Sequence, residues 1–135
     1  MPKVHFENKE IAQALNLPIN DIEFTLDEWG NVDCFFLENE ILILMEIEKG
    51  QKHPNTNVLK VWPYLEKYPN LKMVLIQLIH PANKAPKNRL KLCVFTGQKL
   101  EKLFPDRFRF IHRPWNPEYA RAINGQIKNR IATIT

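Results

Sequence analysis

Three acidic residues near the middle of the chain have the types and spacing for metal-dependent chemistry. Asp33 stands at the start of one predicted strand, and Glu46 and Glu48 stand at the end of the next. Residues two apart in a strand point to the same face, so Glu46 and Glu48 share a face. A turn at residues 38–40 predicts an antiparallel hairpin that places Asp33 roughly opposite Glu46.

Carboxylates grouped in this way repel one another and lose hydration among the apolar residues beside them, such as Val32 and Leu44. A divalent cation offsets both effects, and ligation by oxygen alone favours Mg²⁺ or Mn²⁺ over zinc. The alternative is that each acid is simply a solvated strand end. Their shared face at the end of a strongly apolar strand favours the metal site.

The elements that position these acids are expected in the order αβββαβαβα. Helices are predicted over His5–Leu17, Asn55–Tyr68, Asn88–Phe104 and Pro117–Ile131, and strands over Ile22–Leu26, Val32–Leu37, Ile41–Glu48, Leu71–Ile79 and Phe108–Ile111. The first three strands form a predicted meander. Pro63 is expected to kink or break the second helix. A meander followed by crossovers through helices predicts an α/β fold with a mixed central sheet flanked by helices.

One run of residues adds a family resemblance to this pattern. Val32-Asp33 is followed, after twelve residues, by Glu46-Ile47-Glu48-Lys49 and then by a helix that contains Asn57 and Lys60-Val61-Trp62. This arrangement over roughly residues 5–80 resembles the restriction-endonuclease-like, or PD-(D/E)xK, nuclease superfamily. The resemblance implies a restriction-endonuclease-like αβββαβ core that positions acidic residues around Mg²⁺ to hydrolyse phosphodiester bonds.

The resemblance also assigns metal ligands. Asp33 corresponds to the central ligand and Glu46 to the second, and the backbone carbonyl of Ile47 is available as a third oxygen. Glu10 on the first helix, or Glu7 one turn earlier, is the candidate to complete the acidic cluster, with an ordinary surface acid as the alternative.

The usual lysine of the motif is missing, because Glu48 stands in its position. Some members of the superfamily use an acidic residue there, and others recruit a lysine from the adjacent helix, so Lys60 is the candidate replacement. Lys49 and Lys52 are the other nearby lysines. The expected catalytic set is therefore Asp33, Glu46, Glu48 and Lys60.

The second half of the chain is expected to supply a DNA-binding surface. Residues 1–67 hold 6 basic and 12 acidic residues, for a net charge of −6, whereas residues 68–135 hold 13 basic and 3 acidic residues, for +10. An arginine row on the last strand and a basic proline-containing loop could follow a phosphate backbone, although solvated faces are the competing interpretation. The candidate contacts are Lys84, Lys87, Arg89, Arg107, Arg109 and Arg113.

Composition bounds the class of protein. A length of 135 residues with 44% hydrophobic residues fits a single domain, residues 1–135, with a basic part from about 81 to 135 packed on the core. The longest apolar run, Ile41–Met45, is too short to span a bilayer, and the opening residues do not resemble a secretory leader. We expect a soluble, cytoplasmic protein in which Cys34 and Cys93 are buried, reduced thiols.

Three interpretations remain open from the sequence. The first is a Mg²⁺-dependent endonuclease acting on DNA, with a homodimer as one way to cut both strands of a duplex. The second is a catalytically inactive module of the same fold that binds nucleic acid or a protein partner, and the third is a small α/β domain unrelated to nucleic acid. The residue at position 48 distinguishes the endonuclease from the inactive module, because a lysine there in place of Glu48 would have favoured catalysis directly.

Overall fold

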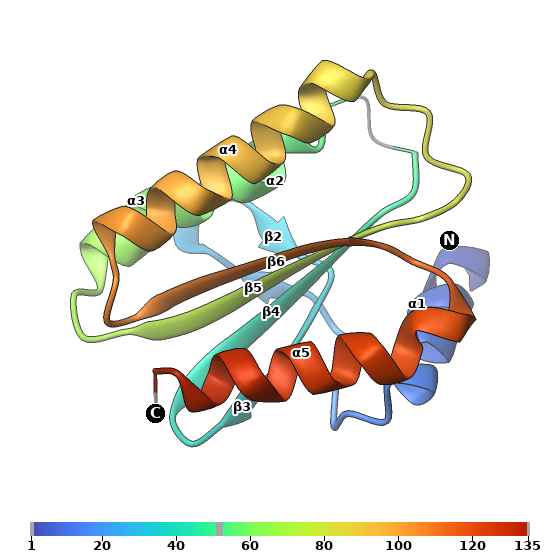
Figure 1. Ribbon diagram of the computed structural model, residues 1–135, viewed down its shortest axis with the longest axis horizontal. Helices are drawn as coiled ribbons and strands as arrows, with labels where there is room; N and C mark the ends of the chain where they lie inside the picture. Colours follow the sequence, from blue (N-terminus) through green and yellow to red (C-terminus); the bar gives the residue numbers. More distant parts are fainter. Residues whose placement is uncertain (1, 51–52, 135) are drawn as a thin grey trace.

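A mixed four-stranded sheet lies at the centre of the structure (Figure 1). The computed structural model describes residues 2–50 and 53–134, with side chains described from residue 8 onward. In spatial order the strands are β3 (Cys34–Glu38), β4 (Ile41–Glu48), β5 (Lys72–Ile79) and β6 (Phe108–Pro114). β3 and β4 are antiparallel, whereas β4, β5 and β6 run parallel. The prediction of an α/β fold with a mixed sheet is confirmed.

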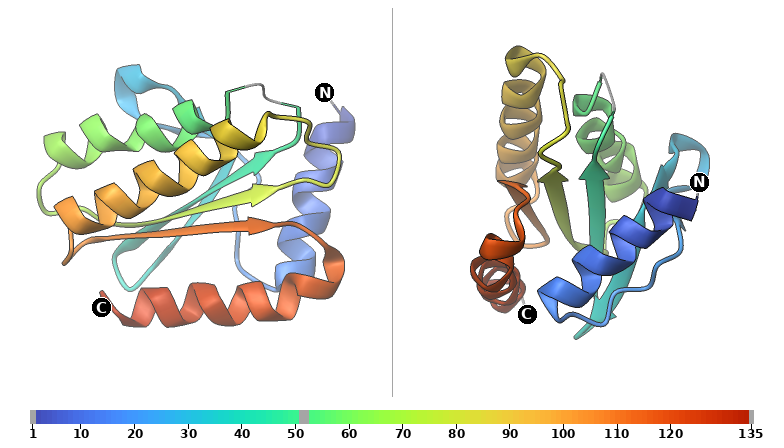
Figure 2. Two further views of the ribbon diagram at one scale, coloured as in Figure 1. Left: turned by 45° about the horizontal axis from the view of Figure 1, so that its top comes forward. Right: turned by 90° about the vertical axis from the view of Figure 1, so that its right-hand side faces the viewer.

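Helices cover both faces of this sheet (Figure 2). One face packs against α1 (Pro2–Leu15) and α5 (Ala120–Ala132), and the other packs against α2 (Asn55–Leu59), α3 (Val61–Lys67) and α4 (Lys87–Leu103). Every residue of β4 is buried, and its odd-numbered side chains join the α1/α5 core while Leu42 and Leu44 join the other. Glu46 and Glu48 continue the even series, so strand alternation directs them to the α2 side.

The first predicted strand does not join the central sheet. β1 (Phe24–Thr25) pairs only with β2 (Asn31–Val32), in a separate two-stranded sheet around the 3₁₀ turn η1 (Asp27–Trp29). The predicted antiparallel pairing of the first strand with the start of the second is present, and Asn20 bridges Phe35 of β3, but the meander does not form one continuous sheet. The predicted strand over residues 32–37 is also interrupted at Asp33, because the Asp33 amide donates to the Glu46 side chain instead of to a neighbouring strand.

The second predicted helix is broken at Lys60, as Pro63 led us to expect. Proline has no N–H, so the carbonyl of Leu59, four residues earlier, has no helical donor. α2 ends at Leu59 and α3 begins at Val61. The break places Lys60 at the junction of two short helices beside the even face of β4.

The C-terminal elements follow the predicted order. Asn116 caps the last helical segment by accepting a hydrogen bond from the amide of Glu118, at the start of η2 (Pro117–Tyr119). Trp115 is buried in the same core as α5. Cys34 and Cys93 are buried free thiols, as expected. Within the described ranges, no helix has both the length and the apolar character needed to cross a bilayer.

Gly97→Ala is expected to destabilise the fold. A Cβ at Gly97 in α4 would lie 2.0 Å from the Phe110 ring on β6, so the helix and the strand could no longer pack as they do. Overpacking of this kind lowers the free energy of unfolding by about 1–3 kcal/mol, which urea unfolding measures. Gly125→Ala in α5 is the matched control, since a Cβ there meets nothing within 4 Å. Equal stabilities of the two variants would contradict the packing argument.

Candidate active site at the carboxyl end of β4

Asp33 and Glu46 are held against each other by backbone hydrogen bonds. The register that pairs Cys34 with Met45 brings them opposite each other, as the predicted hairpin requires. The Asp33 amide donates to Glu46 Oε1 at 2.8 Å, and the Ile47 amide donates to Asp33 Oδ2 at 2.9 Å. Each carboxylate is thereby fixed by the backbone of the other's segment, so both side chains have a defined direction before any ligand arrives.

Glu48 faces a different set of partners. Its side chain is fully buried, and both of its oxygens accept from Asn57 Nδ2 at 2.9 Å. Oε2 also accepts from Gln77 Nε2 on β5 at 2.7 Å. The Gln77 Oε1 atom in turn lies 2.8 Å from Nδ1 of His112 on β6. Glu48 is thus the acceptor at the centre of an amide network that joins β4, β5 and α2.

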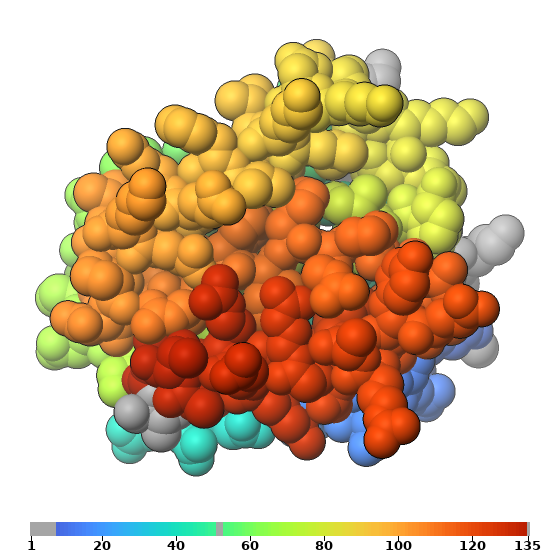
Figure 3. All heavy atoms as spheres, in the orientation of Figure 1, coloured from blue at the N-terminus to red at the C-terminus, as the bar shows by residue number. Residues whose placement is uncertain are grey.

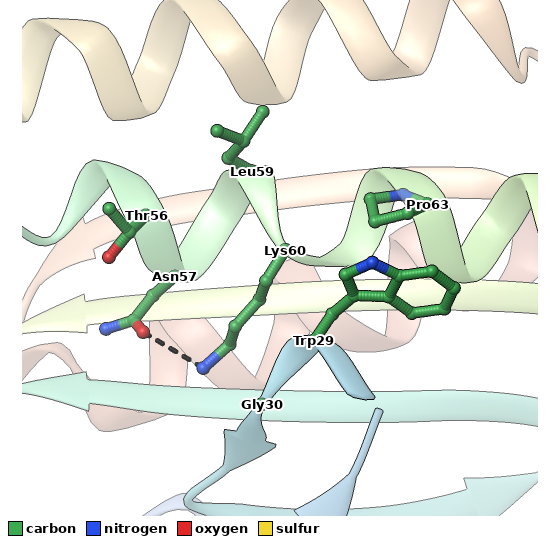
Figure 4. A pocket seen from close by; sticks show the side chains of 7 residues that line it. All are labelled: Trp29, Gly30, Thr56, Asn57, Leu59, Lys60 and Pro63. Carbon is green, nitrogen blue, oxygen red and sulfur yellow. Dashed lines mark hydrogen bonds between the residues drawn. The ribbon is translucent and has the colours of Figure 1, made fainter. Parts of the chain in front are cut away.

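Lys60 reaches the acids from the break between α2 and α3. Its Nζ lies 3.3 Å from Glu46 Oε2 and 2.9 Å from Asn57 Oδ1, and it also donates to the Asn31 carbonyl (Figure 4). The Asn57 amide can only be oriented one way here, because its Nδ2 donates to Glu48 while its Oδ1 accepts from Lys60. Glu48 therefore positions Asn57, and Asn57 positions Lys60.

Burial dominates the electrostatics of the three acids. It raises the pKa of Asp33, Glu46 and Glu48 above their usual values. For Glu46 the negative charge of Asp33 adds to the effect and Lys60 opposes it, and its pKa rises to about 8. The Gln77 and Asn57 hydrogen bonds act in the opposite direction on Glu48. A positive charge placed between Asp33 and Glu46 would favour their ionised forms.

The donor set suits a hard cation with few protein ligands. In the described part of the chain, no group of three or more His, Cys, Asp or Glu side chains is arranged to hold a metal ion. Glu48 is turned toward Asn57 and Gln77, which leaves Asp33 and Glu46 as the adjacent pair. Mg²⁺ commonly uses only one or two protein carboxylates and completes its shell with water and substrate phosphate. The pair, with the Ile47 carbonyl as a possible third oxygen, is compatible with that requirement.

The other residues that the sequence predicted for the acidic site do not lie in the cluster of Asp33, Glu46 and Lys60. Glu10 is exposed on α1, which packs on the opposite face of the sheet, and it lines a shallow pocket with His80 and Trp115. Lys49 lies in the bend after β4. The side chain of Glu7 and all of Lys52 fall outside the described residues.

The predicted arginine row does not form one surface with the acids. Arg107 donates to the carbonyls of Leu65, Tyr68 and Leu71 around the end of α3. Arg109 bonds Thr133 after α5, and Arg113 bonds Gln126 within α5. Alternation along β6 directs Arg109 and Arg113 to the α5 side of the sheet, opposite the acids. These partly buried arginines form hydrogen bonds within the protein, and Arg109 and Arg113 lie on the other side of the sheet from the acids.

The basic loop before α4, by contrast, adjoins the acidic site. Asn83 Nδ2 and the His80 amide both donate to the Glu48 carbonyl at 3.0 Å, which ties the loop to the end of β4. Lys84 and Lys87 are exposed, and Arg89 follows in the first turn of α4. The loop and the start of α4 project from the upper edge of the molecule (Figure 3).

Sequence reasoning had no role for Asn57 and missed Gln77 altogether. Gln77 is the one polar residue inside the apolar run from Met73 to Ile79, which is a signal that a buried strand has a polar partner to satisfy. Comparison of the chain with protein-family models, curated proteins and solved structures gives no match. The proposal of a function therefore depends on the site itself.

Proposed function

We propose that this chain is a metal-dependent nuclease that hydrolyses phosphodiester bonds in DNA, built on a restriction-endonuclease-like core. The observation that carries the proposal is the convergence of Lys60 on Glu46, at 3.3 Å, beside Asp33. Two carboxylates and a lysine come together from three separate segments of the chain, at the end of a buried strand. Ordinary ion pairs lie at the protein surface. In this pair Glu46 is buried, with only 3% of its surface exposed.

The proposed roles follow from these contacts. Asp33 and Glu46, with the Ile47 carbonyl, would hold Mg²⁺ or Mn²⁺. The bound metal supplies Lewis-acid stabilisation of the phosphate and a water of lowered pKa. Lys60 would exchange one of its three acceptors, Glu46, Asn57 or the Asn31 carbonyl, for the phosphoryl oxygen on which negative charge develops. Glu48, through Asn57, keeps the Lys60 ammonium directed at that position and is not itself a metal ligand.

The loop that carries Lys84 and Lys87 is the proposed route of the DNA backbone to the site. Its attachment to the Glu48 carbonyl keeps both exposed lysines at the same edge of the sheet as the acids. Phosphate contacts of this kind make binding fall steeply with salt. Replacing Arg109 or Arg113 of β6 by alanine is expected to lower the stability of the fold more than the affinity for DNA.

The proposal predicts metal-dependent cleavage that requires the acid pair. Linear, nicked, branched and single-stranded DNA are incubated with the protein in Mg²⁺ or Mn²⁺, and products are separated on a gel. We expect cleavage of at least one substrate, its loss in EDTA, and its loss in the double variant Asp33→Ala, Glu46→Ala, because no ligand pair remains.

Glu10→Ala is the control, since it removes an exposed acid outside the cluster and should leave the rate unchanged. Cleavage that survives the double variant would refute the assignment of the site. No cleavage of any substrate by the wild-type protein, together with binding that weakens as salt rises, would favour an inactive module of the same fold.

A further inference from the structure

A cleft of about 560 Å³ opens beside Lys60 (Figure 4). Its walls come from η1 and from the α2–α3 segment, and they include Trp29, Thr56, Asn57, Leu59, Lys60 and Pro63. Lys60 and Asn57 belong both to this cleft and to the acidic cluster. Whatever occupies the cleft therefore lies next to the proposed catalytic groups.

The Trp29 wall of the cleft is fixed in place before binding. The Trp29 amide donates to the carbonyl of the buried Leu26 at 3.0 Å. Asp27, in the same turn, accepts from Lys67 Nζ at 2.9 Å and from the Tyr68 hydroxyl at 2.7 Å, which ties the turn to the end of α3. The Lys67 ammonium also lies 5.8 Å from the Trp29 ring centroid. A fixed aromatic wall loses little conformational entropy when a flat ligand stacks on it.

The two ends of the cleft differ in chemistry. Trp29 and Pro63 form an apolar end, and the Lys60 ammonium with the Asn57 amide forms a polar, cationic end. A ligand that matches both ends carries a flat ring at one end and an anion at the other. Among nucleic acids this describes a single nucleotide whose base is free to stack, because the bases of a duplex are already stacked and paired.

We infer that the cleft binds one unpaired nucleotide of the substrate strand, with its base on Trp29 and its phosphate at Lys60. The inference rests on the proposed function, since it names single-stranded DNA, or DNA with an unpaired nucleotide, as the substrate of that site. The volume lies within the usual range of small-ligand pockets and is far too small for a duplex.

The test measures binding separately from cleavage. Asp33→Asn protein is used in EDTA, so that the strand stays intact while the side chain can still accept from the Ile47 amide. Affinities for a fluorescein-labelled oligothymidylate and for a duplex of equal length are measured by anisotropy. Adding Trp29→Ala is expected to weaken single-strand binding about tenfold and to leave duplex binding unchanged, because stacking on one aromatic ring is lost. Trp29→Phe should restore most of the affinity.

Phe95→Ala is the matched control, because Phe95 is a 63% exposed aromatic on α4 that does not line the cleft. It should bind both probes as the parent does. Unchanged single-strand binding in Trp29→Ala, or equal losses for single strand and duplex, would overturn the inference even if wild-type protein cleaves DNA. Trp29-dependent binding without any cleavage by the wild-type protein would support the inference and refute only the nuclease proposal.

Discussion

Glu46→Gln is expected to reduce metal-dependent DNA hydrolysis by more than about 10²-fold and to stabilise the fold above pH 8. The loss of activity follows from the loss of an anionic metal ligand. The gain in stability follows from burial and the charge of Asp33, which raise the pKa of Glu46 from 4.5 to about 8. Glutamine keeps the shape of the side chain and an oxygen that can accept from the Asp33 amide.

The direction of the pH effect comes from proton linkage. Because burial raises the pKa of Glu46 to about 8, the metal-free folded state binds this proton more tightly than the unfolded state does between pH 4.5 and 8. The Glu46 contribution to stability is therefore complete below pH 4.5 and is lost as the pH rises through 8. A rise in pKa from 4.5 to about 8 corresponds to about 5 kcal/mol, so we expect wild-type protein to lose up to that much unfolding free energy across this range on account of Glu46, and the variant to lose correspondingly less.

Urea unfolding in EDTA at several pH values measures this difference. Mg²⁺ at high pH is expected to raise the melting temperature of the wild type and not that of Glu46→Gln, because a ligand stabilises only the state that binds it. Glu118→Gln, an exposed acid in η2, is the control and should follow the wild-type pH curve. A variant less stable than the wild type at pH 9 would mean that the Lys60 ion pair outweighs burial and repulsion at Glu46.

Local sequence patterns predicted the parts of the site that depend on neighbouring residues. Strand alternation placed Glu46 and Glu48 on one face, the turn at residues 38–40 placed Asp33 opposite Glu46, and Pro63 predicted the break that exposes Lys60 to the acids. Each of these follows from backbone geometry over a few residues. The partner of Glu48 could not be found in this way, because Gln77 is 29 residues away and meets it only through the register of β4 with β5.

The arginine row marks another limit of sequence reasoning. Alternation correctly put Arg109 and Arg113 on one face of β6, but spacing along a strand does not say which helix covers that face. α5 packs on that face, and its Gln126 side chain accepts a hydrogen bond from Arg113. The spacing predicted the shared face of these arginines but not their hydrogen bonds to residues in and after α5. By contrast, Lys84 in the loop before α4 and Lys87 at the first position of α4 are exposed, and Asn83 ties this loop to the Glu48 carbonyl.

Lys60→Met is expected to lower the rate of DNA cleavage by about 10²–10³-fold while the protein stays folded, because it removes the ammonium that lies 3.3 Å from Glu46 Oε2. Methionine fills most of the space of the lysine stem and has no charge. The loss should appear in kcat more than in KM, since the proposed hydrogen bond strengthens as charge develops on the phosphate. Single-turnover cleavage with saturating protein measures it directly. Lys99→Met, an exposed lysine on α4, should cleave at the wild-type rate.

Adding Glu48→Lys to Lys60→Met is expected to leave the protein inactive, although it places a lysine where PD-(D/E)xK nucleases usually carry one. Position 48 is fully buried, and Gln77 Nε2, which the Pro54 carbonyl also holds, points a donor at it. A lysine there would meet no carboxylate in place of Glu48 and could find an acceptor only if the Asn57 amide turned its Oδ1 toward it. A buried charge without a partner costs about 3–5 kcal/mol, which thermal melting of the variant would reveal. Activity restored by this double variant would show that position 48, and not Lys60, can supply the catalytic cation. Full activity of Lys60→Met alone would equally remove Lys60 from the mechanism.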